Sequence, residues 1–216
     1  MRVRSKQKLM IVAGIALVAT CVACLLTWTA RQPAVPGLAA AGGAMTVLPE
    51  TKMLTPFALE DHEGRRFDAG RLRGAWTLLF FGFTSCPDIC PTTLADLARL
   101  RRALAARGDD SKWMRIVFVS VDPGRDDRAT LARYVRFFDP SLTGVTGTPE
   151  ELARLARQLG AAFEVLASEE PDYPVYHTTA VFVIDADARW RAVLRSPLAV
   201  EEVAVALGAL RRASGD

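Results

Sequence analysis

Two cysteines separated by three residues are the strongest chemical signal in the chain. Cys86 and Cys90 lie in the segment FGFTSCPDICP, directly after a strand-like apolar run. Far downstream, His177 precedes a second apolar run, TTAVFVID. Two thiols and one imidazole form a ligand set for a soft metal ion, and the two thiols alone could act as a redox pair.

The spacing of the two cysteines favours a metal site. If the turn between them is helical, positions i and i+4 place both sulfurs on one face, where they can converge on one ion. A strand followed by a short loop and a helix start is also where a helix N-terminus lowers the pKa of a thiol. The spacing departs from the C-x-x-C of thioredoxin-type redox motifs, although it could close a disulfide with modest adjustment. Metal binding and redox cycling therefore both remain open.

Copper fits this ligand set better than structural zinc does. Thiolates suit Cu(I), and an added imidazole keeps Cu(II) accessible. A closed structural zinc site uses four protein ligands, whereas the sequence offers Cys86, Cys90 and His177. Three ligands leave one coordination position of the ion open. An open position suits a catalytic metal ion, and it also suits an ion that is transferred to another protein. His177 also has a structural interpretation, as a buried histidine hydrogen-bonded at the start of a strand.

Other polar residues near these motifs carry weaker signals. His62 falls in a predicted surface turn, where we expect a solvated side chain without a functional role. Asp88 is predicted to cap the helix that follows the cysteines. Asp122 and Asp126 follow a second buried strand, and we expect them to be loop and cap residues. A supporting role near the cysteine loop stays open for both.

An apolar segment near the N-terminus predicts a membrane anchor. Residues 9–30 are uncharged and mostly apolar, and as a helix they would span about 33 Å, close to the hydrocarbon thickness of a bilayer. The basic start, residues 1–8, should stay in the cytoplasm. We therefore predict a single-pass protein of the bacterial inner membrane with its C-terminal domain in the periplasm. The alternatives are a signal peptide cleaved near residues 38–41 and a lipoprotein cysteine at Cys21 or Cys24.

Length and charge limit the remaining possibilities. Of the 216 residues, those beyond the predicted anchor and linker suffice for one domain of about 160–170 residues with its own core. The net charge is +3, but four basic residues lie in the first eight positions and no acidic residue precedes Glu50. The rest of the chain is almost neutral and has no basic stripe with interleaved aromatic residues. The sequence therefore gives no indication of nucleic-acid binding.

The hydrophobic pattern predicts an α/β domain over residues 51–216, after a flexible linker at 31–50. A hairpin is expected at 57–67, buried strands at 75–83 and 115–121, a short strand at 161–166, and a second hairpin at 180–195. Helices are expected at 92–107, 131–138, 148–159 and from 200 onward. Thr148 and Pro149 form a strong helix start. Alternating strands and helices indicate an α/β sheet with antiparallel additions.

Several segments together resemble one protein family. FGFTSCPDICP, FVSVDPGRDDRATLARYVRFFDP, TGTPEELARLAR and DYPVYHTTAVFVIDADARW are similar, in this order, to the Sco/SenC family, whose members are anchored thioredoxin-like proteins that help assemble the binuclear copper centre of cytochrome c oxidase. The resemblance implies a thioredoxin-like domain with β-hairpin additions and copper bound by Cys86, Cys90 and His177. One departure is Tyr176, where many relatives carry an acidic residue. The missing carboxylate beside His177 could weaken Cu(II) binding or change how the imidazole is oriented.

Three functions follow from the resemblance and the residues together. The first is a copper metallochaperone that delivers copper to the copper-site subunit of cytochrome c oxidase, and it uses all three ligands. The second is a thiol–disulfide oxidoreductase that reduces the oxidase copper-site cysteines, and it needs only Cys86 and Cys90. The third is a membrane-tethered redox or copper sensor. The sequence favours the first, which is not an enzyme, and it does not identify the copper donor.

Overall fold

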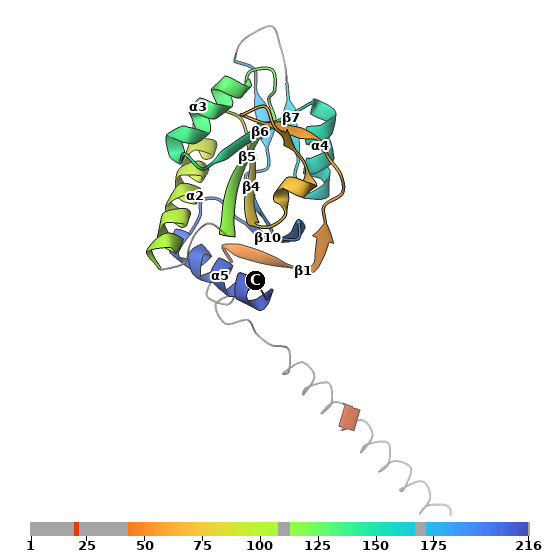
Figure 1. Ribbon diagram of the computed structural model, residues 1–216, viewed down its shortest axis with the longest axis vertical. Helices are drawn as coiled ribbons and strands as arrows, with labels where there is room; N and C mark the ends of the chain where they lie inside the picture. The colour runs from red at the N-terminus through yellow and green to blue at the C-terminus, as the bar shows by residue number, and fades with distance from the viewer. Residues whose placement is uncertain (1–19, 22–42, 108–112, 167–171, 216) are drawn as a thin grey trace, which may run out of the picture. The chain divides into compact units, whose positions relative to one another are not determined.

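The computed structural model describes residues 20–21, 43–107, 113–166 and 172–215 (Figure 1). Its main sheet has eight strands in the order β1-β10-β9-β4-β5-β6-β2-β3, and a separate two-stranded sheet pairs β7 with β8. The strands are β1 Met45–Met53, β2 Leu59–Asp61, β3 Arg66–Phe67, β4 Trp76–Gly82, β5 Met114–Ser120, β6 Thr143–Thr146, β7 Phe163–Val165, β8 Val175–His177, β9 Val181–Ile184 and β10 Arg189–Leu194.

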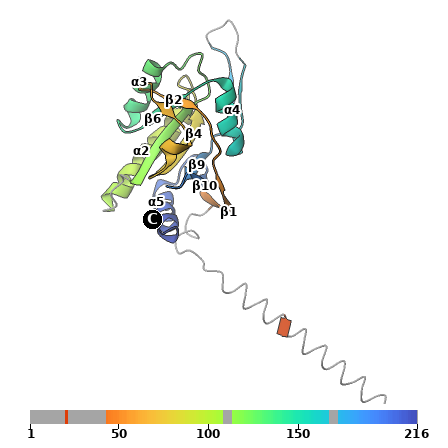
Figure 2. The same ribbon diagram turned by 45° about the vertical axis from the view of Figure 1, so that its right-hand side comes forward.

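Helices cover both faces of the main sheet (Figures 1 and 2). The helices α2 (Ile89–Ala106), α3 (Arg128–Phe138) and α5 (Val200–Ala213) contribute buried side chains to one hydrophobic cluster. The helix α4 (Pro149–Gln158) and the short 3-10 helix η2 (Ala69–Leu72) contribute to the cluster on the other face. The sheet is thus buried between two layers, as the alternating sequence pattern predicts.

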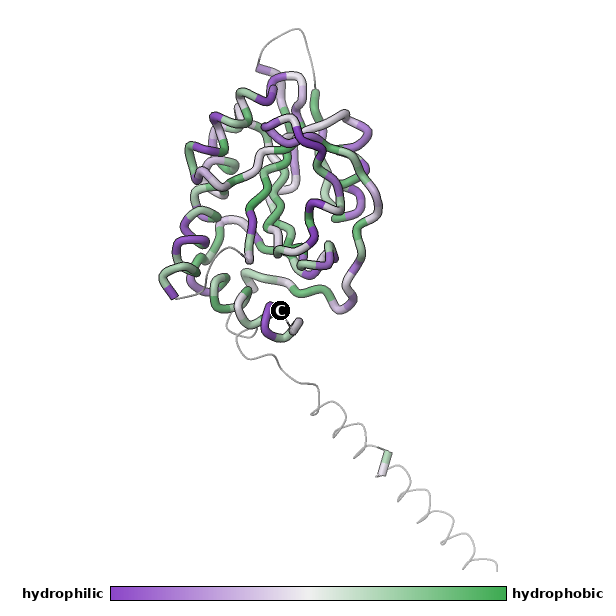
Figure 3. Tube along the Cα trace, in the orientation of Figure 1, coloured by the Kyte–Doolittle hydropathy of each residue, from purple (hydrophilic) through white to green (hydrophobic). Residues whose placement is uncertain are grey.

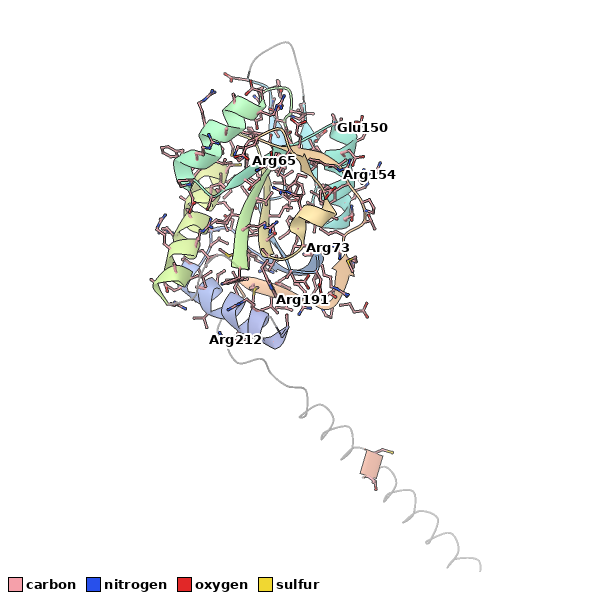
Figure 4. All side chains as sticks on the ribbon, viewed as in Figure 1. Arg65, Arg73, Glu150, Arg154, Arg191 and Arg212 are labelled. Atoms are coloured by element: carbon pink, nitrogen blue, oxygen red, sulfur yellow. The ribbon has the colours of Figure 1, made fainter. Side chains whose placement is uncertain are left out.

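Strand β4 lies at the centre of this arrangement, and every one of its residues is buried. Leu78 and Phe80 belong to the cluster on one face of the sheet, and Leu79 and Phe81 belong to the other. A strand with apolar side chains on both faces needs a cover on each face, which explains its continuous apolar run. Hydrophobic residues follow this strand through the middle of the domain in Figure 3, whereas the exposed side chain of Arg212 lies at the lower edge of the domain in Figure 4.

The direction of the strands determines where the loops meet. Strands β4, β5 and β6 are parallel, and Gly82 at the end of β4 lies beside Ser120 at the end of β5. The cysteine loop after β4 and the Asp122 loop after β5 therefore leave the sheet at the same edge. The hairpin β9–β10 adds to the other side of β4 in the antiparallel sense. The predicted α/β sheet with antiparallel additions is confirmed.

Two predicted boundaries are wrong. Residues 45–50, which we expected in the linker, belong to β1, where Met45 pairs with Leu194 of β10. A strand at the sheet edge needs no continuous apolar pattern, so hydrophobic periodicity did not reveal this one. Helix α2 begins at Ile89, three residues before the predicted start, and therefore includes Cys90. Residues 31–42 of the predicted linker lie outside the described residues, and residues 43 and 44 form a turn and a bend before β1.

The predicted N-terminal anchor is largely outside the described part of the chain. Of residues 9–30, the structure describes Thr20 and Cys21, which are helical and exposed, and residues 1–8 are not described. Among the helices that are described, none combines the length and the apolar character required to cross a membrane.

Candidate metal centre

Cys86, Cys90 and His177 come together at the edge of the sheet where β4 ends. Their three possible ligand atoms all lie within 4.8 Å of one another, and the Sγ atom of Cys90 is 3.3 Å from Nε2 of His177. Cys86 lies in the loop after β4, Cys90 in the first turn of α2, and His177 at the end of β8. In the described ranges, no other group of three or more His, Cys, Asp and Glu residues could hold a metal ion.

The two thiols differ in their surroundings. Cys86 is partly exposed, whereas Cys90 is fully buried within the cluster formed by α2, α3 and α5. Burial raises the pKa of the Cys90 thiol far above its ordinary value, and a backbone hydrogen bond from Phe83 offsets only part of that effect. The predicted lowering of the thiol pKa by the helix N-terminus is therefore wrong for Cys90, because desolvation outweighs the helix field. A metal ion must displace a proton from this sulfur.

The imidazole of His177 is held in the form that can bind a metal. Its Nδ1 atom lies 3.0 Å from the carbonyl oxygen of Thr178, and because a carbonyl can only accept, Nδ1 carries the proton. Burial lowers the pKa of His177, although the hydrogen bond to Thr178 acts in the opposite direction. A neutral ring with its proton on Nδ1 presents the lone pair of Nε2 toward Cys90.

Two aromatic rings fix the position of the imidazole. Phe80 and Phe83 meet it edge-on, with ring centroids 5.8 Å and 5.9 Å away. His177 also pairs with Phe163 across the two-stranded sheet. It is thus half-buried and hydrogen-bonded as a structural histidine is, while its second ring nitrogen faces the thiols. The role of this second nitrogen as a metal ligand remains a prediction.

The side chain of Tyr176 points away from the imidazole. Successive side chains of a strand point to opposite faces, and Tyr176 is 61% exposed while His177 faces the interior. Its cross-strand neighbour is Glu164 of β7. The carbonyl of Thr178 accepts the hydrogen bond that orients the ring. An effect of Tyr176 on Cu(II) binding or on the imidazole orientation remains a prediction.

A buried carboxylate ties the cysteine loop to the neighbouring strand. Asp126 accepts hydrogen bonds from the backbone N–H of Thr84 at 2.9 Å, from the Thr84 hydroxyl at 2.6 Å and from the Ser120 hydroxyl at 2.5 Å. Burial raises its pKa despite these bonds. The cap of α3 is the next residue, Asp127, which accepts from the N–H of Thr130 at 2.7 Å. Asp126 therefore has the supporting role that the sequence left open.

Two other sequence expectations are wrong. Asp88 occupies the N-cap position of α2, but its side chain makes no capping hydrogen bond. His62 is partly buried rather than solvated, because its Nδ1 accepts a hydrogen bond from the N–H of Gly144 at 3.1 Å. That contact joins the turn after β2 to β6 and gives His62 a structural role. The absence of a functional role for His62 remains a prediction.

A shallow groove leads to the histidine side of the cluster. It encloses ≈ 620 Å³ beside the two-stranded sheet. Its lining residues are Ala162, Phe163, Glu164, Tyr176, His177 and Thr178. An ion held at this site would therefore lie close to a surface that a partner protein can reach.

Comparison with known proteins gives a consistent result. The SCO1/SenC family profile matches residues 46–211. The Mus musculus protein named Protein SCO2 homolog, mitochondrial, is 41% identical over 61% of this chain and 51% of its own, so the chain spans about half the length of that relative. The structure of Bradyrhizobium japonicum ScoI with copper bound is 34% identical, covers 74% of this chain and 98% of that one, and has a TM-score of 0.64. The apo Sco1 protein from Thermus thermophilus is also 34% identical, covering 76% of this chain and 95% of its own with a TM-score of 0.68. The thioredoxin-like Sco fold is thereby confirmed.

Proposed function

The chain belongs to the SCO1/SenC family, and we propose that it is a copper metallochaperone that delivers copper to the binuclear copper centre of cytochrome c oxidase. The observation that carries the proposal is the pairing of Cys90 with His177. A purely redox protein needs only two thiols, whereas here an imidazole with its Nδ1 proton committed to Thr178 faces the buried thiol at 3.3 Å.

The donor atoms fit a single copper ion. Typical metal–sulfur and metal–nitrogen bonds of about 2.3 and 2.0 Å allow two donors of one ion to lie up to about 4.6 Å apart. The three candidate donors lie within 4.8 Å of one another, so binding needs only a small movement. Two thiolates with one imidazole accept both Cu(I) and Cu(II), and three protein donors leave one position for an incoming ligand.

The unequal burial of the thiols gives the hand-over a direction. Cys90 is buried in the core, whereas Cys86 is partly exposed in the loop after β4. A cysteine of the copper-site subunit would reach the ion from the Cys86 side and replace this ligand first. Cys90 would be displaced last, because it is the ligand buried in the core, whereas Cys86 and His177 are both half-buried.

A thiol–disulfide oxidoreductase is the second candidate. The observation that favours it is the closeness of Cys86 and Cys90, which are both unbridged here. In such a reaction Cys86 would be the attacking thiol, because it is accessible. The buried thiol of Cys90 would then resolve the mixed disulfide with the partner. In this reaction Nε2 of His177, 3.3 Å from the Cys90 sulfur, would accept the proton of the resolving thiol, and no copper would be needed.

We further propose that residues 9–30 anchor the protein in the bacterial inner membrane, with the domain in the periplasm. The apolar run and the preceding basic residues support this placement. The protein should remain with the membranes after a high-salt wash, and protease added outside the inner membrane should reach the domain. Release of a soluble species beginning near Ala39 or Ala41 would show a cleaved signal peptide instead.

Oxidase activity in cells separates the two candidate functions. Strains carrying His177→Ala or Cys86→Ser should both lose oxidase activity under copper limitation, and excess copper should partly restore the His177→Ala strain. A Tyr176→Phe strain is the matched control, because this exposed neighbour contributes no ligand atom. If His177→Ala is fully active while Cys86→Ser is inactive, the metallochaperone proposal fails and the thiol reductase replaces it.

A further inference from the structure

Three side chains near the candidate metal centre form a compact cluster that the ligand set does not include. The carboxylate of Asp122 accepts a hydrogen bond from the Tyr173 hydroxyl at 2.7 Å and one from Nε of Arg125 at 2.5 Å. The Arg125 guanidinium in turn lies over the Tyr173 ring, 3.9 Å from its centroid. Each member of the cluster therefore contacts the other two.

The cluster joins the segment before His177 to a loop that is itself attached to the cysteine loop. Asp122 and Arg125 belong to the loop between β5 and α3, which Asp126 ties to the cysteine loop through Thr84. Tyr173 lies two residues before β8, the strand that ends at His177. Arg125 also lies 5.6 Å from the ring centroid of Phe83, the residue whose edge meets the imidazole of His177.

The histidine strand needs such an attachment. In the described residues, β8 is hydrogen-bonded as a strand to β7 and is not part of the eight-stranded sheet. Side-chain contacts must therefore hold this two-stranded sheet against the edge where the cysteines lie. The Asp122 side chain is only 2% exposed, so its hydrogen bonds are shielded from competing water.

We propose that Asp122, Arg125 and Tyr173 form a latch that positions His177 against Cys86 and Cys90. The latch holds β8 to the loop between β5 and α3, and opening it moves the imidazole away from the two thiols. These are positioning residues, since none of them supplies a ligand atom to the cluster. The latch deepens the proposed function. Its effect on copper binding rests on that function, whereas its effect on the motion of β8 does not.

Two variants remove different parts of the latch. Tyr173→Phe deletes only the hydroxyl that donates to Asp122 and retains the ring beneath Arg125. Arg125→Gln removes the guanidinium from both Asp122 and Tyr173. Tyr176→Phe is the matched control, because it makes the same chemical change three residues away on an exposed side chain outside the latch.

The first measurement needs no metal. Amide hydrogen exchange is followed in the reduced, metal-free full-length protein for peptides that cover residues 172–178. Because a hydrogen bond to a charged group shifts an equilibrium about ten-fold, Tyr173→Phe should speed exchange there by about that factor. Peptides from β4 and β5 should exchange as in the unmodified protein, as should all peptides of Tyr176→Phe. Unchanged exchange at 172–178 in both latch variants would overturn the proposal, and so would a uniform increase across the domain.

The second measurement couples the latch to the metal centre. Cu(II) added to the reduced protein should bind more weakly in the latch variants by the factor by which the closed fraction of the segment falls, so the loss should be larger in Arg125→Gln, which removes both contacts, than in Tyr173→Phe. The electron paramagnetic resonance signal from nitrogen bound to Cu(II) should weaken in the same order, while Cu(I) affinity should change less. Unchanged Cu(II) affinity and signal in a variant whose exchange shows residues 172–178 open for most of the time would refute the role in positioning His177. If the unmodified protein itself binds no copper, the proposed function fails, and hydrogen exchange alone decides whether the latch exists.

Discussion

Gly82 and Cys90 approach so closely that a β-carbon at position 82 would lie 2.7 Å from the Cys90 sulfur. The same β-carbon would lie 2.7 Å from the ring of Phe118. Strand β4 therefore ends in a residue without a side chain because the buried thiol and an aromatic ring occupy that space. The glycine of the FGFTSC segment is thus part of the metal centre, although it offers no ligand.

Gly82→Ala should displace the Cys90 sulfur and weaken copper binding. Added atoms in a well-packed core cost about 1–3 kcal/mol, so the variant should also unfold at lower temperature. Gly208→Ala in α5 is the control, because its β-carbon would meet its nearest neighbour at an ordinary 3.4 Å and alanine favours a helix. Copper titration and thermal unfolding check both effects. Copper affinity in Gly82→Ala equal to that of Gly208→Ala would contradict this role of Gly82.

Asp126→Asn should loosen the cysteine loop. An amide has one acceptor oxygen, and its NH2 group would face hydroxyls and an N–H that now donate to the carboxylate. The expected cost is about 1–3 kcal/mol of stability, with weaker copper binding and faster alkylation of Cys86. Asp127→Asn changes the adjacent exposed residue, where asparagine caps a helix as well as aspartate does, and should leave both properties unchanged. Equal alkylation rates in the two variants would argue against this function of Asp126.

The sequence was sufficient for the main elements because their signals are local. The apolar run of β4, the Thr148–Pro149 helix start and the hairpin turn after Ile184 each depend on neighbouring residues, and all three are present. The candidate metal site was also predictable, because cysteine and histidine are rare in this chain and combine into few sites. The structure then showed that the three side chains meet.

The interactions that the sequence did not reveal depend on long-range packing. The contact of Tyr173 with Asp122 spans 51 positions, and that of Thr84 with Asp126 spans 42. Nothing in the sequence around Tyr173 or Thr84 indicates which distant residue the side chain will contact. The pKa of Cys90 was predicted in the wrong direction for a related reason, because the extent of burial is a property of the assembled core.

Asp61 should make the stability of the domain depend on acid pH. Burial by itself raises its pKa, but hydrogen bonds from Arg65 and from the N–H of Glu63 outweigh burial, and the pKa is lowered. A carboxyl group with a lowered pKa stabilises the fold above its unfolded value of about 3.9, and this contribution disappears as pH falls through the folded value.

Asp61→Asn should therefore be less stable than the unmodified protein at pH 7, by roughly 1–3 kcal/mol. The difference should begin to shrink below about pH 4, where the carboxyl group of the unfolded chain takes up a proton, and it should vanish once pH falls below the lowered pKa of the native carboxyl group. Asp187→Asn is the control, since that side chain is 79% exposed in the β9–β10 turn. Denaturant unfolding at several pH values checks this. A difference between Asp61→Asn and the unmodified protein that stays constant from pH 7 to pH 3 would show that the carboxylate charge is not responsible.

A disulfide and copper should exclude each other at this site. Cys86 and Cys90 must both be thiolates to bind an ion, and a disulfide uses both sulfurs. The oxidised protein should therefore bind copper far more weakly than the reduced protein, and copper loading should protect both thiols from alkylation. Equal copper affinity in the oxidised and reduced states would eliminate the three-ligand site.

The most direct test of the account is a Cu(II) titration of the reduced full-length protein beside its His177→Ala variant. His62→Ala is the control, because His62 is the other of the two histidines and its Nδ1 accepts from Gly144. Loss of a residue that only orients a metal ligand costs 10–100-fold in affinity, so loss of the ligand itself should lower Cu(II) affinity by more than about 100-fold. Cu(I) should be affected less, and the Cys86–Cys90 disulfide should still form and be reduced. Cu(II) binding in His177→Ala as tight as in His62→Ala would contradict the metal centre on which the proposed function depends.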